Sequence, residues 1–226
     1  MNVLELFSGT GSVGKCCDKL GWNVISVDLE LPATHECDIM DFDYKQYPQD
    51  HFSVVWASPP CTYYSSLQNC WIGRKKKDGI ITTKEIIEEN RIESDKLIEK
   101  TLEIINYFKP DLWFMENPQR GQLKNRDVVK GIPYYDVSYC MYSDWGYEKR
   151  TRIWTNKKDW NNLICDKSGD CGNMVESQHK KVCDGGYDKR KKHKHKKDVS
   201  IDYGSGTNRL ERYRVPEDLI FSLLLD

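Results

Sequence analysis

Short apolar runs alternate with helical patterns along the first half of the chain, and this alternation restricts the folds that it can adopt. Helical spacing of apolar residues covers 13–20 and 85–108. Four strand-like runs flank these helical patterns: Val3–Phe7, Asn23–Asp28, Phe52–Ala57 and Leu112–Met115. Strands that alternate with helices form parallel sheets covered by helices on both faces. The sequence therefore predicts an α/β fold with a Rossmann-like, mainly parallel sheet.

The pattern changes between residues 160 and 206, where apolar periodicity fades and Gly, Lys, Cys and His accumulate. We expect this segment to be a short irregular insert with a basic character. A helical pattern returns after Pro216, which suits the first turn of a helix, as do the two acidic residues that follow it. Residues 1–159 and 207–226 are therefore expected to form the main domain.

The overall composition is that of a globular protein: 38% of the residues are hydrophobic, 31% are charged, and the net charge is -1. No apolar run approaches the roughly 18 residues that a membrane span needs, and no signal peptide is evident. The nine scattered cysteines indicate reduced thiols rather than a disulfide framework. These features predict an intracellular protein without a membrane partner.

A glycine-rich turn, Ser8-Gly9-Thr10-Gly11, follows the first strand. Glycine lets the backbone approach a ligand closely, and open parallel sheets bind ligands at the carboxyl ends of their strands. Asp28 ends the second strand, where it is placed to accept hydrogen bonds from ribose hydroxyls. Asp38 and Ile39 are candidates to hold an adenine amino group and ring face. A purely structural turn is the alternative for the glycines taken alone.

Cys61 directly follows Pro59-Pro60 after a buried strand, so the thiol is presented by a stiff loop at the strand end. A lone cysteine is more often a small buried hydrophobe, but this position beside a ligand turn favours a nucleophile. Glu116, in Glu116-Asn117-Pro118, supplies a carboxylate at the same edge of the sheet. Arg150 and Arg152 lie at strand spacing, so their side chains share one face. We interpret them as contacts to an anion or a base; the alternative is that they form a solvated surface.

Four motifs together resemble the cytosine-5 DNA methyltransferase family in their order and spacing: Leu6–Gly11, Ser58–Cys61, Glu116–Pro118 and Glu148–Arg152. The resemblance implies an S-adenosylmethionine-dependent enzyme that methylates carbon 5 of cytosine in double-stranded DNA through a covalent adduct of Cys61 with carbon 6. It implies that Glu116 contacts the ring nitrogen N3, and that Arg150 and Arg152 hold the base and neighbouring backbone. The residues expected to line the cofactor pocket are Phe7, Ser8, Gly9, Thr10, Gly11, Asp28, Asp38, Ile39 and Pro59.

The resemblance covers about two-thirds of the chain, and Trp56–Thr62 and Arg152–Asn156 look most like small phage and large-virus members. A viral member would act in the host nucleus or cytoplasm. Members of the family usually have a longer target-recognition region, so residues 160–206 are expected to be a reduced one. They also have a late Gly-Asn-Ser motif, of which Gly204–Asn208 is the nearest equivalent.

Two other functions remain open from the sequence. The same chemistry acts on transfer RNA in one branch of the family, and a short basic recognition segment suits that substrate too. A catalytically silent subunit that binds cofactor or nucleic acid is the second alternative, although the intact Cys61 and Glu116 argue against it.

The insert contains Cys165, Cys171, His179 and Cys183, with the spacing C-x5-C-x7-H-x3-C. This set predicts a tetrahedral zinc site that stabilises the insert. The alternative is that these are unrelated thiols in a loop. Two basic runs, Arg74–Lys77 and Lys189–Lys197, indicate phosphate contacts on an otherwise neutral protein. A solvated loop or a nuclear-import signal is the alternative for the second run.

Overall fold

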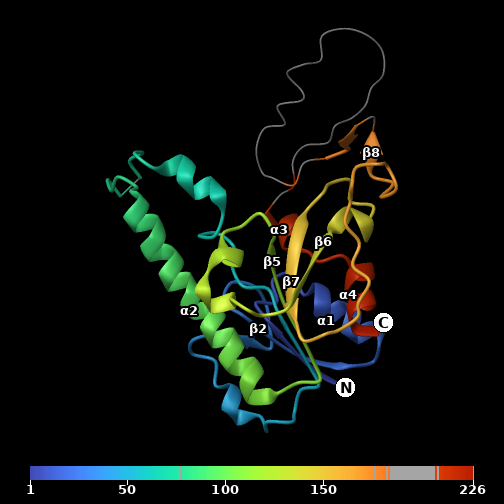
Figure 1. Ribbon diagram of the computed structural model, residues 1–226. Coiled ribbons are helices and arrows are strands. Elements are labelled where there is room, and N and C mark those ends of the chain that lie inside the picture. Colours follow the sequence, from blue (N-terminus) through green and yellow to red (C-terminus); the bar gives the residue numbers. More distant parts are fainter. Residues whose placement is uncertain (77, 176, 182, 184–206, 208, 226) are drawn as a thin grey trace.

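A seven-stranded sheet forms the centre of the molecule (Figure 1). The computed structural model describes residues 1–76, 78–175, 177–181, 183, 207 and 209–225. The strand order is β3-β2-β1-β4-β5-β7-β6. The strands are β1 (Asn2–Leu6), β2 (Asn23–Asp28), β3 (His35–Glu36), β4 (Val54–Ala57), β5 (Leu112–Pro118), β6 (Tyr134–Ser138) and β7 (Arg150–Thr155).

The sheet is mainly parallel, as predicted. Strands β1 to β5 pair in parallel, whereas β7 runs antiparallel to both of its neighbours, β5 and β6. The chain leaves β1 toward β2 on one side and later returns to β4 on the other side of β1. This reversal is the topological switch point of the sheet, where α/β folds bind their ligands. The turn after β1 and the loop after β4 therefore meet at one place.

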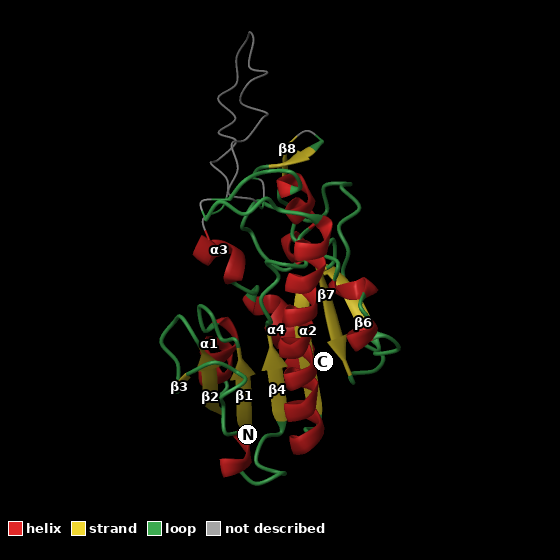
Figure 2. Ribbon diagram, turned by 90° about the vertical axis from the view of Figure 1, so that its left-hand side faces the viewer, coloured by secondary structure: helices red, strands yellow, loops and turns green. Residues whose placement is uncertain are grey.

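Helices cover both faces of the sheet, and each face has its own apolar core. The long helix α2 (Lys84–Phe108) packs against one face with Ile98, Ile104 and Phe108, and Figure 2 shows it running along the strands. The other face is covered by α1 (Ser12–Lys19) and α4 (Glu217–Leu225), which share a second core around Trp56 and Phe114. The α/β fold with helices on both faces is confirmed.

Local sequence signals explain where α2 begins and ends. The Thr83 side chain accepts a hydrogen bond from the backbone amide of Ile86 at 3.3 Å, which caps the first turn. Lys109 adopts a left-handed conformation at the other end, and Pro110 follows it, so the helix cannot continue. The short helix α3 (Arg209–Tyr213) precedes α4. None of the described helices is long and apolar enough to cross a bilayer.

The part of the insert that the structure describes is largely irregular. Its regular elements there are two short strands, β8 (Met174–Val175) and β9 (Gln178–His179), which pair as an antiparallel hairpin. Trp160 anchors the start of the segment: its indole nitrogen donates to the Ser222 hydroxyl of α4 at 2.9 Å, and its ring stacks on Tyr142. The start of the insert is therefore packed against the main domain rather than set apart from it.

Glu5 ties β1 to the start of α1 from within the core. Its carboxylate accepts hydrogen bonds from the backbone amides of Val13 and Gly14, at 3.2 and 3.0 Å. These amides belong to the first turn of the helix, which has no partners within the helix itself. Burial nevertheless raises the pKa of Glu5 to about 7, because the two hydrogen bonds only partly offset the loss of hydration.

We expect Glu5 to make the stability of the protein depend on pH. The folded state holds the Glu5 proton more tightly than the unfolded state, whose carboxyl titrates near 4.5. The contribution of the protonated Glu5 to the free energy of unfolding is therefore complete below about pH 4.5. It is lost as the pH rises through about 7, and the free energy of unfolding falls by about 3 kcal/mol. Glu5→Gln cannot ionise, so it should gain stability relative to the native protein between pH 5 and pH 8. Denaturant unfolding of both proteins across this range measures the difference, and parallel curves would contradict it.

Candidate active site

The turn after β1 has an unusual backbone. Phe7, Gly9 and Gly11 all adopt left-handed conformations, with φ angles of 55°, 55° and 65°. Glycine tolerates this region, but a bulky residue such as Phe7 is strained there by about 1–3 kcal/mol. The turn is held by backbone hydrogen bonds from Ser8 to Val27 at 3.1 Å and from Gly11 to Ser8 at 2.8 Å. The Phe7 ring is thereby directed toward the carboxyl ends of β1 and β2, where it lines two cavities.

Asp28, at the end of β2, organises the loops around this turn. Its Oδ2 accepts a hydrogen bond from the Gly9 amide at 2.8 Å, and its Oδ1 accepts from the amides of Glu30 and Leu31, at 2.9 and 2.8 Å. An ionised carboxylate offers about four acceptor positions, so these three bonds leave one of them, on Oδ2. Asp28 therefore has a structural role that the sequence did not predict, beside its predicted role as an acceptor for ribose.

A cavity of about 240 Å³ lies between the turn after β1 and the loop after β4. It brings together residues predicted to bind the cofactor and residues predicted to act in catalysis. The predicted residues that line it are Phe7, Gly9, Asp28, Pro59, Cys61 and Glu116. Lys149, Arg212 and Tyr213 also line it, and the last two belong to α3. The segment just before α4 therefore borders this cavity.

Two further cavities adjoin the first. One of about 80 Å³ is lined by Phe7, Asp38, Ile39 and Leu97, so the predicted adenine contacts lie beside the main cavity. The other, open to solvent, lies on the far side of Gly9, and Ser8, Thr10 and Gly11 line it. The predicted cofactor residues thus surround the glycine turn, but they do not all face one cavity.

The loop that carries Cys61 is clamped to the neighbouring strand. The side-chain amide of Asn117, fully buried in β5, donates to the Pro59 carbonyl oxygen at 2.9 Å. The backbone amide of Ser58 donates to the Leu6 carbonyl oxygen at 3.1 Å, which fixes the start of the same loop against β1. These two contacts explain why an asparagine follows Glu116: it holds the loop after β4 at the end of β5.

Glu116 lies in a polar pocket at the end of β5 and is almost fully buried. Its Oε1 accepts hydrogen bonds from the Tyr139 hydroxyl at 3.0 Å and from the Lys149 ammonium group at 3.3 Å. Lys149 also donates to the Arg212 carbonyl oxygen at 3.0 Å and lies 4.7 Å from the centre of the Tyr139 ring. A carboxylate, a phenol and an ammonium group therefore meet at one side of the main cavity.

Two opposing effects act on the Cys61 thiol. Burial raises its pKa above the ordinary value, and the Lys149 charge lowers it in part. Glu116 opposes Lys149, because a nearby negative charge also raises the pKa of the thiol. Lys149 is the charged side chain of the pocket that favours a thiolate most strongly.

Arg150 and Arg152 do not line the main cavity. Arg152 makes a bidentate ion pair with Asp136 of β6, at 2.7 and 2.8 Å, and lies against the Tyr134 ring. Arg150 donates to Glu148 at 2.7 Å and to the Cys165 carbonyl oxygen at 3.0 Å. The two arginines share a face of β7, as predicted. Lys149, one position away and so on the other side of the chain, takes the place beside Glu116. Strand spacing alone does not single out Lys149, although this residue lies inside one of the motifs.

The segment after Cys61 extends from the body of the protein. It contains the short helix η2 (Ser66–Trp71), drawn in cyan in Figure 1. A bridge between Lys75 and Ile81 follows it. Several large apolar side chains are exposed on it: Tyr63, Leu67, Trp71, Ile72, Ile80 and Ile81. Arg74, Lys75 and Lys76 of the first basic run are exposed there too. Lys77 and the second basic run lie outside the described residues.

The structure changes the predicted metal-ligand set. Cys165, Cys171 and His179 lie together, but the fourth side chain of the group is Cys140 rather than Cys183. Cys140 lies in η5 (Tyr139–Met141), directly after β6 and 25 or more residues from the other three along the chain. Spacing within the insert could not reveal it, because the contact depends on how the insert folds back onto the sheet.

Comparison with known proteins identifies a relative over the whole chain. A protein of Frog virus 3 (isolate Goorha), described as "Probable DNA (cytosine-5)-methyltransferase", is 38% identical over 232 residues, and the match covers 99% of each protein. No family model matches the chain.

Solved structures with a similar arrangement are more distant. EhMeth, a methyltransferase of Entamoeba histolytica, is 15% identical with a TM-score of 0.48, over 74% of this chain and 57% of its own. A mutant of DNMT2 from Spodoptera frugiperda is 16% identical with a TM-score of 0.42, over 72% of this chain and 54% of its own. This chain therefore spans little more than half the length of these two structures.

Proposed function

Because the chain belongs to the DNA (cytosine-5)-methyltransferase family, we propose that it methylates carbon 5 of cytosine in double-stranded DNA through a covalent adduct of Cys61. The observation that carries the proposal is the main cavity, where Cys61, Glu116 and Lys149 share one space with the glycine turn and Asp28. The reacting thiol and the cofactor-binding turn are thus within reach of the same bound base.

The donor set around the glycine turn fits S-adenosylmethionine. Asp28 keeps one acceptor position for a ribose hydroxyl, Ile39 and Phe7 offer apolar surface for an adenine ring, and Asp38 supplies a carboxylate beside it. Gly9 and Pro59 border the main cavity between these groups and Cys61. When bound, S-adenosylmethionine supplies an electrophilic methyl group on a sulfonium. This chain's residues orient it toward the base.

The chemistry requires cytosine to be activated first, since carbon 5 is a poor nucleophile. The Cys61 thiolate adds to carbon 6, and the electron pair of the 5,6 double bond shifts from carbon 5 toward carbon 4 and N3. This addition makes carbon 5 enamine-like. Glu116 contacts N3, where negative charge develops during the addition, and can donate a proton there. After methylation, a solvent base takes the carbon 5 proton, the 5,6 double bond forms again as the Cys61 thiolate leaves, and N3 returns its proton to Glu116. The base must leave the duplex for this addition, because the thiol attacks above the ring plane.

Lys149 has two tasks in this scheme. Its charge favours the thiolate form of Cys61, and its hydrogen bond holds the Glu116 carboxylate in place. Arg150 and Arg152 act indirectly. The ion pair of Arg152 with Asp136 holds β7 against β6, the hydrogen bond from Arg150 to the Cys165 carbonyl oxygen holds it against the insert, and both contacts position Lys149. Arg150 and Arg152 are therefore positioning residues in our proposal.

The remaining parts of the chain are assigned to substrate binding. Residues 1–159 and 207–226 form the catalytic domain, and residues 160–206 serve as a reduced target-recognition insert. The exposed basic side chains after Cys61 contact phosphates and position the duplex without reading its sequence. The exposed apolar side chains there contact DNA around the extruded base.

The experiment that tests this function measures methyl transfer from labelled S-adenosylmethionine to duplex DNA and to transfer RNA. We expect label at carbon 5 of cytosine in DNA. Label found in transfer RNA alone would establish the RNA alternative, and cofactor binding without transfer to either substrate would establish a silent subunit.

Removal of the Asp28 carboxylate is expected to weaken cofactor binding. Loss of a charge-assisted hydrogen bond costs about 1.5–3 kcal/mol, so Asp28→Ala should raise the Kd for S-adenosylmethionine about ten- to a hundredfold. Asp28→Asn should have a smaller effect, because its amide oxygen can still accept hydrogen bonds from backbone amides. Calorimetry measures both variants, with the exposed Asp50→Ala as the control. An unchanged Kd in Asp28→Ala would remove this residue from the site.

Removal of the Lys149 charge is expected to slow adduct formation. Lys149→Met eliminates the charge that lowers the pKa of Cys61, so the thiolate becomes scarcer at neutral pH and the rate profile moves to higher pH. Loss of the charge-assisted bond to Glu116 adds a decrease of about ten- to a hundredfold in turnover. Rates from pH 6 to pH 9 measure both effects, with the exposed Lys158→Met as the control. A lower turnover with an unmoved pH profile would argue against the effect on the thiol.

A further inference from the structure

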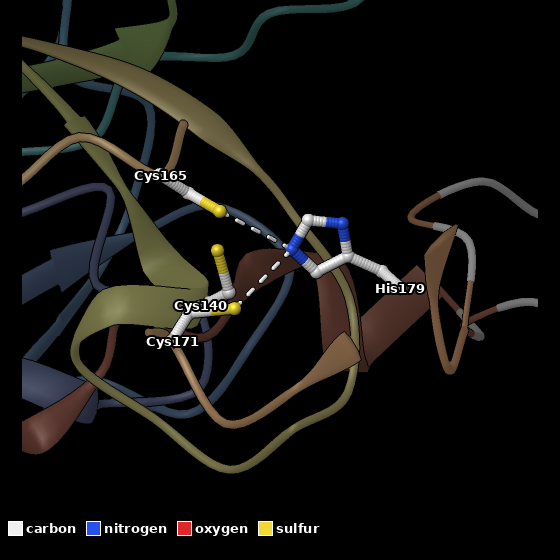
Figure 3. A group of neighbouring side chains, drawn as sticks. All are labelled: Cys140, Cys165, Cys171 and His179. Atoms are coloured by element: carbon white, nitrogen blue, oxygen red, sulfur yellow. Dashed lines mark hydrogen bonds between the residues drawn. The ribbon is translucent and has the colours of Figure 1, made fainter. Parts of the chain in front are cut away.

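Three thiols and one imidazole converge on a single point beside the sheet (Figure 3). They belong to Cys140, Cys165, Cys171 and His179, and their ligand atoms all lie within 4.8 Å of one another. Three of the four residues are buried, and Cys171 is half-buried. All three cysteines are free thiols rather than disulfide partners. The scheme proposed for methyl transfer uses none of these side chains.

Two distances within this cluster match the sulfur–nitrogen edge of a tetrahedral metal site. The sulfur atoms of Cys165 and Cys171 lie 3.6 and 3.7 Å from the same nitrogen of His179, Nε2. With Zn–S near 2.3 Å and Zn–N near 2.0–2.1 Å, a tetrahedron has a sulfur–nitrogen edge of about 3.6 Å. A neutral imidazole nitrogen has one lone pair and accepts one hydrogen bond, so thiol donation explains only one of these two contacts. A shared metal ion explains both.

The backbone around the cluster is already held in place. Asn173, which is 1% exposed, donates from Nδ2 to the carbonyl oxygens of Cys140 and Cys171, each at 2.9 Å. Its Oδ1 accepts from the Gly146 amide at 2.9 Å. Arg150 donates to the Cys165 carbonyl oxygen at 3.0 Å. The loops that carry the three cysteines are therefore fixed by contacts that do not use the thiols themselves.

We propose that Cys140, Cys165, Cys171 and His179 bind a structural zinc ion. Thiolate and imidazole ligands in a tetrahedral arrangement are those that zinc prefers, and oxygen-seeking ions such as Mg²⁺ or Ca²⁺ would need carboxylates here. Four protein ligands complete the coordination shell, so no position is open for a water molecule or a substrate. The ion therefore stabilises the fold and takes no part in chemistry.

The proposed zinc ion connects the insert to the catalytic pocket. Three ligands come from the insert, whereas Cys140 lies next to Tyr139, whose hydroxyl donates to Glu116. Arg150 provides a second connection, from Cys165 to β7. Loss of the metal should therefore loosen residues 165–181 first and then disturb the hydrogen bonds to Glu116.

Metal analysis of the full chain, purified without chelators, tests the proposal. We expect about one zinc per chain in the native protein, with strong loss in Cys140→Ser. The matched control is Cys183→Ser, which removes the cysteine that spacing alone would have chosen, and it should keep its zinc. Metal-free native protein that does not take up added zinc would overturn the proposal. So would zinc that remains in Cys140→Ser and is lost from Cys183→Ser.

A second measurement keeps the test valid if Cys140→Ser fails to fold. Alkylation of the native protein, read by mass spectrometry with and without a chelator, reports each cysteine separately. Zinc should protect Cys165 and Cys171 from alkylation until the chelator is added, whereas the exposed Cys70 should react equally in both conditions. Replacement with Co²⁺ should add the absorption bands of thiolate ligands. Alkylation that does not depend on the chelator, or a disulfide between two of the three cysteines, would contradict a metal site.

Discussion

Cys61→Ser is expected to abolish methyl transfer and covalent trapping while cofactor binding survives. A serine hydroxyl is a far weaker nucleophile than a thiolate at neutral pH, so turnover should fall by at least about four orders of magnitude. DNA that contains 5-fluorocytosine should trap the native enzyme, because fluorine cannot leave carbon 5 as a proton does. Denaturing gels of enzyme with labelled DNA show the adduct directly.

The control for this experiment is Cys70→Ser, which removes an exposed thiol on the segment that follows Cys61. It should trap DNA at the native rate. An adduct that persists in Cys61→Ser would show that another residue is the nucleophile and would disprove the assignment of that role to Cys61.

Glu116→Gln is expected to cause the second-largest loss. Glutamine fills the same space and keeps an oxygen that can accept from Lys149, but its amide cannot donate an acidic proton to N3. General acid–base assistance is worth about 10²–10⁴ in rate, so turnover should fall within that range. Trapping by 5-fluorocytosine should slow in parallel, because the missing contact acts on the addition of Cys61. Single-turnover rates of adduct formation and of methyl transfer measure the two effects.

Glu93→Gln provides the matched control, since Glu93 also pairs with a lysine, Lys96, but does so on the exposed side of α2. Its turnover should stay within about twofold of the native value, as expected for a surface ion pair. A Glu116→Gln enzyme that kept native turnover would exclude Glu116 from the addition step.

The sequence predicted the parallel half of the sheet because its signals there are local. Each of the strands β1, β2, β4 and β5 is an apolar run bounded by turn residues, and α2 has its cap and its terminating proline in the sequence. The sequence also predicted that the Cys61 loop and Glu116 lie close together, because the carboxyl ends of parallel strands meet at one edge of the sheet. The helices on both faces then followed from the alternation.

The parts that the sequence missed depend on contacts between distant segments. Strand spacing correctly predicts that Arg150 and Arg152 share one face of β7. Which residue of this segment reaches the pocket depends on how β7 pairs with β5, and in that pairing Glu116 lies opposite Ile153. Cys140 likewise reaches Cys165, Cys171 and His179 from outside the insert, so no spacing within the insert could predict it. The hydrogen bond from the Gly9 amide to Asp28 joins residues that lie 19 positions apart in the sequence, so no local pattern predicts it.

The left-handed backbone of Phe7 places a cost to folding beside the proposed cofactor pocket. Glycine at this position would adopt the same φ angle without steric strain, so Phe7→Gly removes a cost to folding at the place where the proposed cofactor pocket gains its aromatic wall. The Phe7 ring also packs against the apolar core, and glycine increases the freedom of the unfolded chain, so Phe7→Gly would lose about as much stability as the relieved strain returns. Stabilisation is better sought far from the end of β1.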